Sequence, residues 1–377
     1  MIIRGVEIVG EGGALRDIHL TGARITDVAP SGAAAGDVGS LLFGDAIAFP
    51  GLINSHDHLD FDLYPPLGHG PYADYLTWGE DIHRRDRGQI ASIEAVPRPY
   101  RARWGAVKNL LAGVTSVAHH GEPVATQSIR LLGGTAIHSV RLEPRWRRRL
   151  NSPLNPPPFV VHIGEGISGA CHREIDRLLA WNVWRRDLIG VHAIAMDARQ
   201  ARRFRALVWC PLSNAFLYGR SADIQALKAH TTILFGTDST LTADWNFWNH
   251  LRGARASGLL SDRELFEAVT GSAAAVWNRP DLGRLAVGGA ADLVVARKKT
   301  ADPWGAFFAL DPEDLLLVLR DGIPLLVDRS LEGVPPPPTG FAVRVGGTQK
   351  IIAEDAPALL KEIRGRGLRP NLDLEAP

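Results

Sequence analysis

Two histidines one residue apart, His56 and His58, stand in the stretch PGLINSHDHLD at residues 50–60. The short apolar run GLI before them predicts a buried strand, and both imidazoles follow at its end. Residues i and i+2 of a strand point to the same side of a sheet. Two neutral imidazoles on one side can hold a divalent cation between them. The pair therefore indicates a metal site if other stretches of the chain supply further ligands.

Four later stretches repeat the pattern of an apolar strand followed by side chains that bind metals or carry protons. They are VHIGEG at 161–166, LIGVHAI at 188–194, WCPLSN at 209–214 and LFGTDS at 234–239. The carboxyl ends of the strands in a (β/α)8 barrel meet at one mouth, so residues far apart in the sequence can share one site. The candidate residues at these ends are His162, Glu165, His192, Ser213, Asn214, Asp238 and Ser239.

Four of the candidates carry the nitrogen and oxygen ligands that suit Zn²⁺ or Fe²⁺. A bound cation lowers the pKa of its water from about 15.7 toward about 7, which supplies hydroxide at neutral pH. Four protein ligands and one water make a five-coordinate catalytic site. We expect one divalent metal ion, Zn²⁺ with Fe²⁺ as the alternative, and the candidate ligands are His56, His58, His162 and Asp238.

Two further side chains could support the reaction of that hydroxide. Glu165, three residues after His162, can carry a proton from the water to a leaving nitrogen. His192 can orient the nucleophile or stabilise the charge that develops on the attacked group. Asp238 can act both as a ligand and as a proton acceptor. The candidate catalytic residues are therefore Glu165, His192 and Asp238.

This combination predicts a hydrolase that cleaves a carbon–nitrogen bond by attack of a metal-bound hydroxide on an sp² carbon. Deamination of an amino-substituted heterocycle fits the pair of Glu165 and His192 best. Hydrolysis of a cyclic or linear amide uses similar groups and stays an alternative, as does dehalogenation. An alternative of another class is a noncatalytic barrel scaffold, although relatives of that kind typically lose one or more ligands.

The composition is that of an ordinary soluble protein. Of 377 residues, 45% are apolar and 22% charged, and the formal net charge of +1 points to neither nucleic acid nor membrane as a partner. The two cysteines, Cys171 and Cys210, cannot form a disulfide framework. No apolar run has the length of a signal peptide core or of a spanning helix. We expect a cytoplasmic protein that acts on a small-molecule substrate.

The middle of the chain, residues 50–282, alternates apolar strands with helices, which is typical of parallel strands joined by crossover helices. The length favours an α/β fold with a (β/α)8 barrel of the TIM type. Seven strands are clear, and an eighth is expected in the proline-rich stretch 142–158 or elsewhere in a distorted form. A capping box of Ser261 and Glu264 predicts a helix that runs to about Trp277.

Both ends of the chain carry short apolar runs separated by glycine-rich turns, the pattern of a small antiparallel β unit. Neither end has enough strands to bury a core alone. We therefore expect one β-sandwich built from both ends, with 1–49 and 283–349 as its two parts and 350–377 as a C-terminal tail.

Several further residues are candidates for substrate binding. The loop YPPLGHGPYADYLTW, which contains His69, can act as a wall or lid of the pocket. One of His119 and His120, at a strand end, can line the pocket, whereas metal binding by either is not expected. Trp245 can stack on a planar substrate or pack against a helix. The full set of predicted substrate contacts is His69, His119, His120, Asn214, Ser239 and Trp245.

The motifs PGLINSHDH, HIGE, VH, CPLSN and GTDS occur in this order, and GRLAVGGAADLVV follows them. Over residues 1–330 the chain resembles the amidohydrolase superfamily, in particular its branch of cytosine deaminase, S-adenosylhomocysteine deaminase and triazine hydrolases. Members of this superfamily are commonly homo-oligomers. The resemblance implies a metal site of His56, His58, His162 and Asp238, with Glu165 as proton shuttle and His192 as polarising residue.

Two features bear on what this resemblance implies. No lysine occurs between Lys108 and Lys228, so the carboxylated lysine that bridges two metals in binuclear relatives has no counterpart here. One metal is therefore expected, with a bridging glutamate, Glu122 or Glu143, as the alternative. The stretch 120–160 is shorter than in most relatives, and it is the region that would supply much of the substrate pocket. The resemblance therefore does not identify the substrate.

Overall fold

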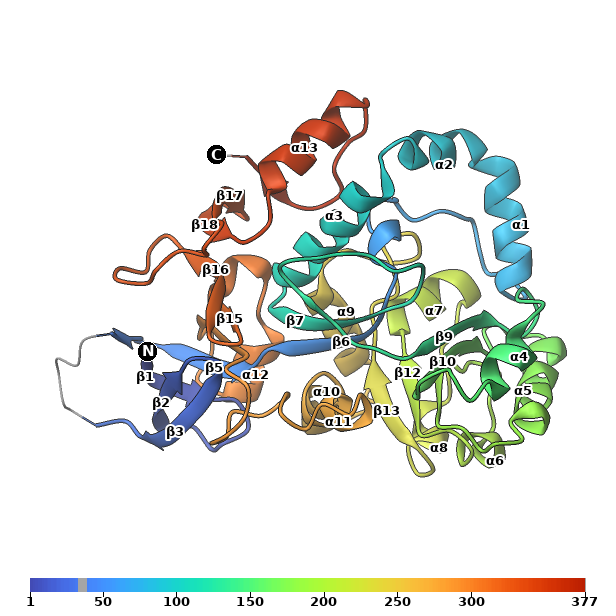
Figure 1. The fold of residues 1–377 in the computed structure, drawn as a ribbon, viewed down its shortest axis with the longest axis horizontal. Coiled ribbons are helices and arrows are strands. Elements are labelled where there is room, and N and C mark those ends of the chain that lie inside the picture. Colours follow the sequence, from blue (N-terminus) through green and yellow to red (C-terminus); the bar gives the residue numbers. More distant parts are fainter. Residues whose placement is uncertain (33–38, 377) are drawn as a thin grey trace.

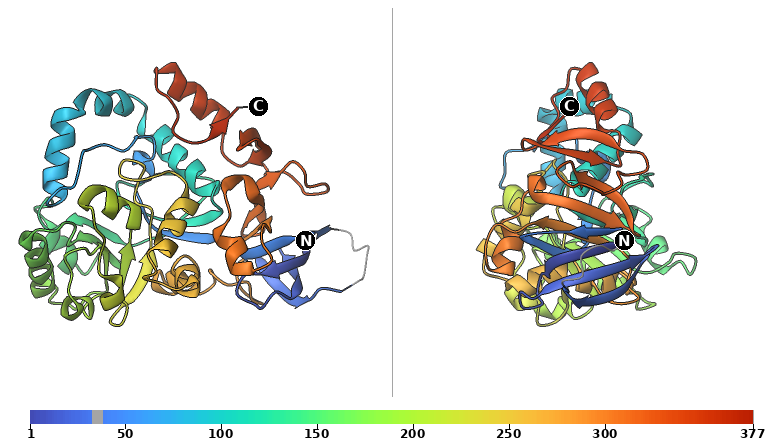
Figure 2. Two further views of the ribbon diagram at one scale, coloured as in Figure 1. Left: turned by 180° about the vertical axis from the view of Figure 1, so that it is seen from behind. Right: turned by 90° about the vertical axis from the view of Figure 1, so that its left-hand side faces the viewer.

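The computed structural model describes residues 1–32 and 39–376. A sheet built from both ends of the chain lies at one end of the molecule, and an α/β body lies at the other (Figure 1). The view from behind shows the same division, with both termini at the end of the sheet (Figure 2). Within these residues, no helix combines the length and the apolar character needed to cross a membrane.

The terminal sheet has 11 strands in one continuous hydrogen-bonded array. Its centre joins the two ends of the chain, because β5 (Ala46–Pro50) pairs antiparallel with β14 (Leu293–Arg297). The other strands from the N-terminal end are β1 (Ile2–Ile8), β2 (Leu15–Thr21), β3 (Arg24–Pro30) and β4 (Ser40–Leu42). Those from the C-terminal end are β15 (Leu315–Arg320), β16 (Ile323–Asp328), β17 (Phe341–Val345), β18 (Thr348–Ile352) and β19 (Leu374–Glu375).

The α/β body contains two parallel sheets. The first has the order β6-β7-β8, and the second has the order β13-β12-β11-β10-β9. The strands of the first are β6 (Leu52–Asp57), β7 (Val114–His119) and β8 (Arg130–Leu131). Those of the second are β9 (Thr135–Ser139), β10 (Phe159–Ile163), β11 (Leu188–His192), β12 (Ala206–Trp209) and β13 (Thr232–Phe235).

These strands confirm the parallel α/β architecture, but hydrogen bonding among the described residues does not show a closed barrel. A single bridge between Asp57 and Asp238 joins β6 to the end of β13, and no ladder joins β8 to β9. The region between them explains the gap. The eighth parallel strand is β8, a distorted strand of only two residues that lies outside the stretch 142–158, and that stretch instead contains the short helix α4 (Trp146–Asn151).

The helices surround the body and connect it to the sheet. Three helices follow β6, and they are α1 (Tyr75–Arg85), α2 (Arg87–Glu94) and α3 (Arg98–Leu110), preceded by the 3-10 turn η1 (Leu59–Phe61). The crossovers and loops of the second sheet contain α5 (Gly169–Trp181), α6 (Ala198–Ala201), α7 (Pro211–Tyr218) and α8 (Ile224–Leu227). The remaining elements are α9 (Phe247–Ala256), α10 (Asp262–Ala268), α11 (Gly271–Val276), α12 (Pro303–Phe308), η2 (Pro312–Asp314) and α13 (Ala356–Gly365).

The helix predicted from Ser261 to about Trp277 is interrupted. Its capping box is present, with the Ser261 hydroxyl accepting from the Glu264 N–H, but α10 ends and α11 begins after a break at Thr270. Thr270 has φ −137° and ψ −105°, far from helical values. Gly283 lies so close that a Cβ there would be 2.5 Å from the Thr270 carbonyl oxygen. The close approach of this second segment accompanies the break, and residue spacing alone does not reveal it.

Aromatic side chains fix the terminal sheet to the body. Phe49 on β5 lies edge-to-face against Trp248 on α9 and Phe307 on α12, with ring centroids 6.1 and 5.1 Å away. The C-terminal segment makes a second connection, because the Trp104 indole N–H on α3 donates to Asn371 Oδ1 over 2.8 Å. Asn371 also donates to the backbone oxygens of Asp62 and Tyr64, beside the mouth of the body.

Candidate metal-dependent active site

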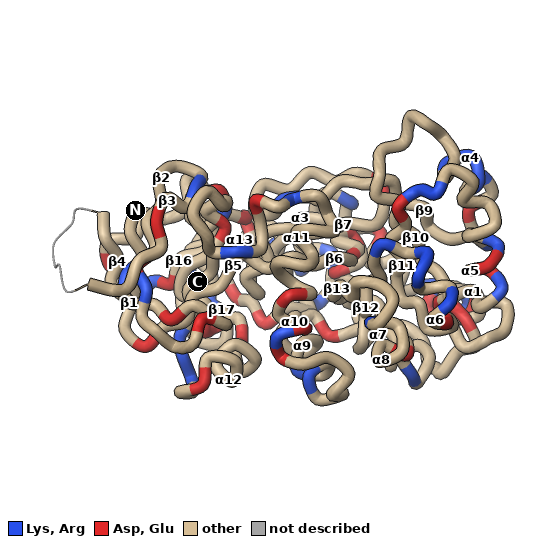
Figure 3. Tube along the Cα trace, turned by 90° about the horizontal axis from the view of Figure 1, so that it is seen from below, with Lys and Arg blue, Asp and Glu red and all other residues tan. Residues whose placement is uncertain are grey.

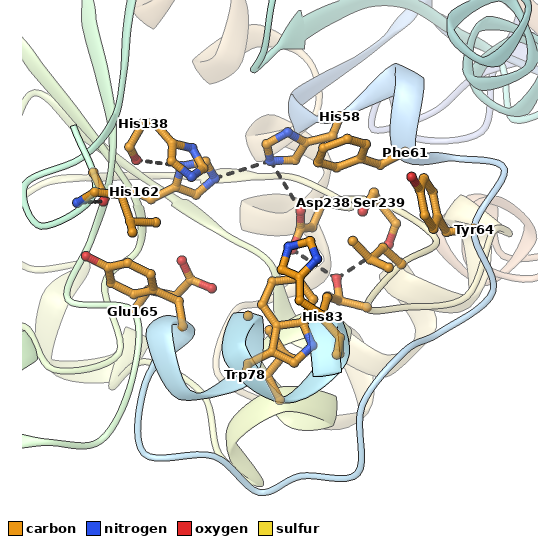
Figure 4. Close-up of a pocket in the computed structure, with 18 of the residues that line it drawn as sticks. His58, Phe61, Tyr64, Trp78, His83, His138, His162, Glu165, Asp238 and Ser239 are labelled. Atoms are coloured by element: carbon orange, nitrogen blue, oxygen red, sulfur yellow. Dashed lines mark hydrogen bonds and ion pairs between the residues drawn. The ribbon is translucent and has the colours of Figure 1, made fainter. Parts of the chain in front are cut away.

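The structure brings four of the predicted residues together at the carboxyl ends of β6, β10 and β13. The Nε2 atom of His162 lies 3.2 Å from that of His56 and 3.3 Å from that of His58. The Asp238 Oδ1 atom lies 3.7 Å from the Nε2 atoms of both His56 and His58. All four side chains are buried. Figure 4 shows His58, His162 and Asp238 pointing toward one another.

Local structure explains this convergence. Every residue of β6 and β10 is buried, so these strands are held between layers and deliver their last histidines to the mouth. Asp238 follows β13 in a left-handed conformation with φ 61°, and its backbone N–H donates to the His56 carbonyl oxygen over 3.1 Å. Non-glycine residues in this conformation are strained and cluster at functional sites.

The histidines are in the form that a metal requires. Burial first, and neighbouring imidazoles second, lower the pKa of His56, His58 and His162 well below the usual value, so these rings are neutral. The Nδ1 atom of His162 lies 2.9 Å from the His138 carbonyl oxygen and must donate to it, which leaves the Nε2 lone pair free. Converging lone pairs on neutral imidazoles, with a carboxylate beside them, fit a divalent cation.

The carboxylate of Asp238 is oriented by two hydroxyls. Ser213 Oγ and Thr242 Oγ1 both donate to Asp238 Oδ2, over 2.6 and 3.0 Å. The other oxygen, Oδ1, is the one that faces His56 and His58. Ser213 belongs to the CPLSN motif and acts here through Asp238.

Other histidines surround this group. Among the described residues, three sets of three side chains have ligand atoms within 4.8 Å of one another. The first set contains His56, His58 and Asp238. The second set contains His56 with His162 and with His192 from β11, and the third contains His162 with His120 and His138, from the ends of β7 and β9. His162 is therefore close to more histidine ligand atoms than the predicted set of four ligands contains.

Glu165 lies beside this group on the loop after β10. The Tyr218 hydroxyl donates to Glu165 Oε1 over 2.8 Å, and Glu165 Oε2 lies 3.7 Å from His192 Nε2. Burial raises the pKa of Glu165, while His192 and the Tyr218 hydroxyl act in the opposite direction. A carboxyl group with a raised pKa can both accept and deliver a proton near neutral pH.

His192 is held in one orientation by Asn214. The distance between His192 Nδ1 and Asn214 Oδ1 is 2.9 Å, so Nδ1–H donates to Asn214 and Nε2 lies on the side of Glu165. His192 also has a left-handed backbone, with φ 69°. Asn214, which was predicted to contact substrate, is fully buried behind His192 and is not among the described residues that line the cavity.

A buried ion-pair network lies behind the two histidines of β6. Lys108 Nζ on α3 lies 3.0 Å from Asp57 Oδ2 and 2.6 Å from Asp62 Oδ1, and all three side chains are almost completely buried. Asn109 donates to Asp57 Oδ2 over 2.7 Å. Because Asp57 stands between His56 and His58, α3 fixes the end of the strand that carries both.

The site opens into a cavity of about 310 Å³. His58, His162, Glu165, His192 and Asp238 line its polar end. The opposite walls are largely apolar and aromatic, and Figure 4 shows Phe61, Tyr64 and Trp78 among them. The apolar lining consists of Phe61, Tyr64, Tyr75, Trp78, Ile82, Ile90, Leu142, Leu217 and Leu241. None of the described lining residues is a lysine or an arginine.

Helices α1 and α2 supply much of this wall. The stretch YPPLGHGPYADYLTW, predicted as a wall or lid around His69, contributes Tyr64, Tyr75 and Trp78 to the lining, and the part of the wall from Ile82 onward was not predicted. The structure puts His69 on the surface, whereas Trp78 and Ile82 face the cavity. Their spacing of four residues on a helix is the signal that could have identified them.

Some of the remaining residues line the cavity, and others do not. Ser239 lines the cavity, and so does His138. His119 instead accepts from the Leu59 N–H and reaches the Glu122 carbonyl oxygen. The residues that lie outside the described lining are His69, His119, His120, Asn214 and Trp245. His120 is nevertheless buried against His162, with ring centroids 4.2 Å apart, and Trp245 packs on the core.

A clamp between three elements holds the loop of Glu165. Arg141 Nη1 lies 2.9 Å from Asp74 Oδ2 at the start of α1, and Arg141 Nε lies 2.9 Å from Glu174 Oε2 on α5. Glu174 Oε1 accepts from the backbone N–H of Gly164, next to Glu165. Burial raises the pKa of Glu174 to about 7, against the opposing effect of Arg141.

Solved structures with a similar fold include zinc-containing enzymes. An adenosine deaminase from Xanthomonas campestris with bound zinc matches with a TM-score of 0.73 and 18% identity, over 97% of each chain. The atrazine chlorohydrolase from Arthrobacter aurescens TC1, complexed with zinc, matches with a TM-score of 0.60 and 19% identity, over 89% of this chain and 97% of that one.

A third similar structure is the aminofutalosine deaminase of Helicobacter pylori in complex with methylthio-coformycin, with a TM-score of 0.59 and 13% identity. It covers 86% of this chain and 99% of that one. No protein-family model matches the chain, and no curated protein matches it by sequence. The similar structures are members of the amidohydrolase superfamily, and this chain has their fold.

Proposed function

We propose that this protein is a hydrolase with one divalent metal ion, Zn²⁺, that removes an amino group from a small heterocyclic substrate. The proposed metal ligands are His56, His58, His162 and Asp238. When bound there, the ion would lower the pKa of its water and make hydroxide available at neutral pH. The observation that carries the proposal is that His58, His162, Asp238 and Glu165 line one cavity, with His56 in contact with this group from behind.

Glu165 is the proposed proton carrier. Its raised pKa and its position beside the ligand group suit a carboxylate that takes a proton from the attacking water. The same group, once protonated, delivers the proton to the departing nitrogen. Deamination needs this second step because an amine leaves only after protonation, and the requirement favours deamination over loss of a halide.

His192 is the proposed polarising residue. Its donor atom Nδ1 is engaged by Asn214, so Nε2 is the atom directed at the cavity, near Glu165 Oε2. From this position it can orient the water or stabilise charge on the attacked group. The left-handed backbone at His192 supports a role that requires an exact orientation.

The cavity supports a small, planar and uncharged substrate. Its volume of about 310 Å³ is at the lower end of the range for small-molecule sites. Aromatic walls from Phe61, Tyr64 and Trp78 can contact the faces of a heterocycle. The lack of lysine and arginine among the described lining residues disfavours a substrate with a phosphate or carboxylate group.

The test is a screen for ammonia release by the zinc-loaded protein with amino-pyrimidines, amino-purines, amino-pterins and amino-triazines. We expect at least one uncharged member to be a substrate and the corresponding nucleotides not to be. A ring-opened product without ammonia would instead show cyclic amide hydrolysis. Metal-replete protein that binds no zinc would contradict the proposed function.

A further inference from the structure

A second cavity, of about 480 Å³, lies at the opposite ends of β11 and β12 from the candidate active site. Its lining includes Leu188, the first residue of β11, and Arg205, which directly precedes β12. The other ends of the same strands lead to His192 and to the CPLSN motif. Figure 3 shows segments of basic residues side by side around β11 and α6.

The charges around this cavity are strongly unequal. Five arginines line it, and the one carboxylate in the described lining, that of Asp187, already pairs with Arg205 at 3.3 Å. The five are Arg185, Arg186, Arg202, Arg203 and Arg205. The whole chain has a formal charge of only +1, so this concentration of positive charge is a local feature.

Two of the arginines are held in place by the protein. The Arg205 Nη2 atom donates to Asn278 Oδ1 over 2.8 Å and to the Ala275 carbonyl oxygen over 2.9 Å. The Arg186 Nη2 atom donates to the Ser152 carbonyl oxygen over 3.0 Å, and its guanidinium lies 5.5 Å from the centre of the Phe159 ring. These contacts fix the walls of the cavity.

Two others are not engaged. Among residues 1–32 and 39–376, the side chains of Arg185 and Arg203 have no hydrogen-bond or ion-pair partner. Arg202 uses only its Nε atom, which lies 3.4 Å from His230 Nδ1. Free guanidinium groups therefore line a cavity in which two other arginines are held by hydrogen bonds.

We propose that this cavity binds a small anion that carries two or more phosphate groups. The planar guanidinium group presents paired N–H donors that match phosphate oxygens. Because the cavity is open to water, one phosphate would be held only weakly, whereas linked phosphates can contact several arginines at once. The volume is that of a small-molecule site, and the charges gather in a hollow rather than along a stripe.

This proposal does not depend on the proposed deaminase function, because it concerns another face and other residues. Calorimetric titration of the intact protein with inorganic tripolyphosphate and with adenosine triphosphate, at about 0.15 M salt, tests it. We expect saturable binding of both at one site per chain, and none of adenosine. Similar affinities would show that the phosphates alone are recognised, and tighter binding of the nucleotide would show an added contact with its base.

The decisive variant is Arg185→Ala with Arg203→Ala, which removes the two free guanidinium groups. We expect it to weaken binding at least tenfold while its circular dichroism spectrum stays unchanged. The matched control is Arg329→Ala with Arg369→Ala, which removes the same charge from exposed positions outside the cavity. Equal weakening by both variants, or no saturable binding below about 1 mM, would overturn the proposal.

Discussion

The hydroxyl of Tyr218, on α7, donates a hydrogen bond to Oε1 of Glu165, on the loop after β10, over 2.8 Å. Burial raises the pKa of Glu165, and this bond partly offsets that effect because it stabilises the ionised form. The two residues are far apart in the sequence, yet together they set the pH range in which Glu165 can accept a proton.

The Tyr218→Phe variant should therefore raise the pKa of Glu165 further. If ionised Glu165 is the proton acceptor, activity falls as pH drops through this pKa, so the acidic limb of the profile of kcat/KM should move to higher pH. We expect a move of about one pH unit, since a hydrogen bond to a charged group contributes about 1.5–3 kcal/mol. Tyr100→Phe, at an exposed position, is the control. An unchanged acidic limb in Tyr218→Phe would contradict the assigned role.

The Glu165→Gln variant should lose activity but not metal. Removal of a proton carrier typically lowers the rate by about 10²–10⁴. Glu165 is not in any of the candidate ligand sets, so the zinc content measured by mass spectrometry should equal that of the unaltered protein. Glu94 is another carboxyl on the cavity wall, and the control variant Glu94→Gln should change the rate by less than about tenfold. Full activity of Glu165→Gln would remove Glu165 from the mechanism.

The Asp238→Ala variant tests the ligand set directly. Zinc that binds only the folded protein adds about 4 kcal/mol to the free energy of unfolding at a thousandfold excess over Kd. The melting temperature therefore rises. We expect a clear upward shift with zinc in the unaltered protein and a much smaller one in Asp238→Ala. Asp176→Ala, at an exposed ion pair with Arg199, is the control and should respond like the unaltered protein. Equal shifts in all three proteins would show that Asp238 is not a ligand.

The Lys108→Met variant should be severely destabilised. It leaves Asp57 and Asp62 buried without their cation, and loss of one partner of a buried ion pair costs about 3–5 kcal/mol. Denaturant unfolding should show this loss. Lys228→Met breaks an ion pair with Glu264 in which the carboxylate is exposed, and it should cost about 1 kcal/mol or less. Similar losses in the two variants would mean that the buried network is not a structural support.

Glu174 should make the protein less stable as pH rises. Its pKa in the folded state is about 7, above the ordinary 4.5, because burial disfavours its charged form. A group with a raised pKa stabilises the folded state fully below its unfolded pKa, and this contribution is lost as pH rises to about 7. Between these values the free energy of unfolding should fall by about 3 kcal/mol relative to Glu174→Gln. Parallel pH curves for the two proteins would contradict a raised pKa.

The sequence was informative where function depends on strand ends. His56, His58, His162, Glu165, and Asp238 follow apolar runs, and parallel strands bring such ends together whatever the details of packing. Closure of the barrel was not predictable in this way. It depends on whether the short stretch after β7 forms a full strand, and β8 pairs through only two residues.

Contacts made by long side chains across the fold were also missed. Tyr218 and Arg141 carry no motif, and their roles depend on where α7 and the loop after β9 happen to face. The same is true of Asn214. It was predicted from the CPLSN motif to contact substrate, but its amide holds His192 and does not line the cavity. Residue type and spacing identify a side chain that can bind or react, but the packing of the folded chain determines which partner it contacts.

Asn371 links two segments that are far apart in the sequence. Its amide reaches the backbone beside η1 and the hydroxyl of Thr240, so one side chain bridges the segments that follow β6 and β13. A substitution of Asn371 would remove this shared support, and a residue that touches no part of the cavity would then loosen the edge of the candidate site.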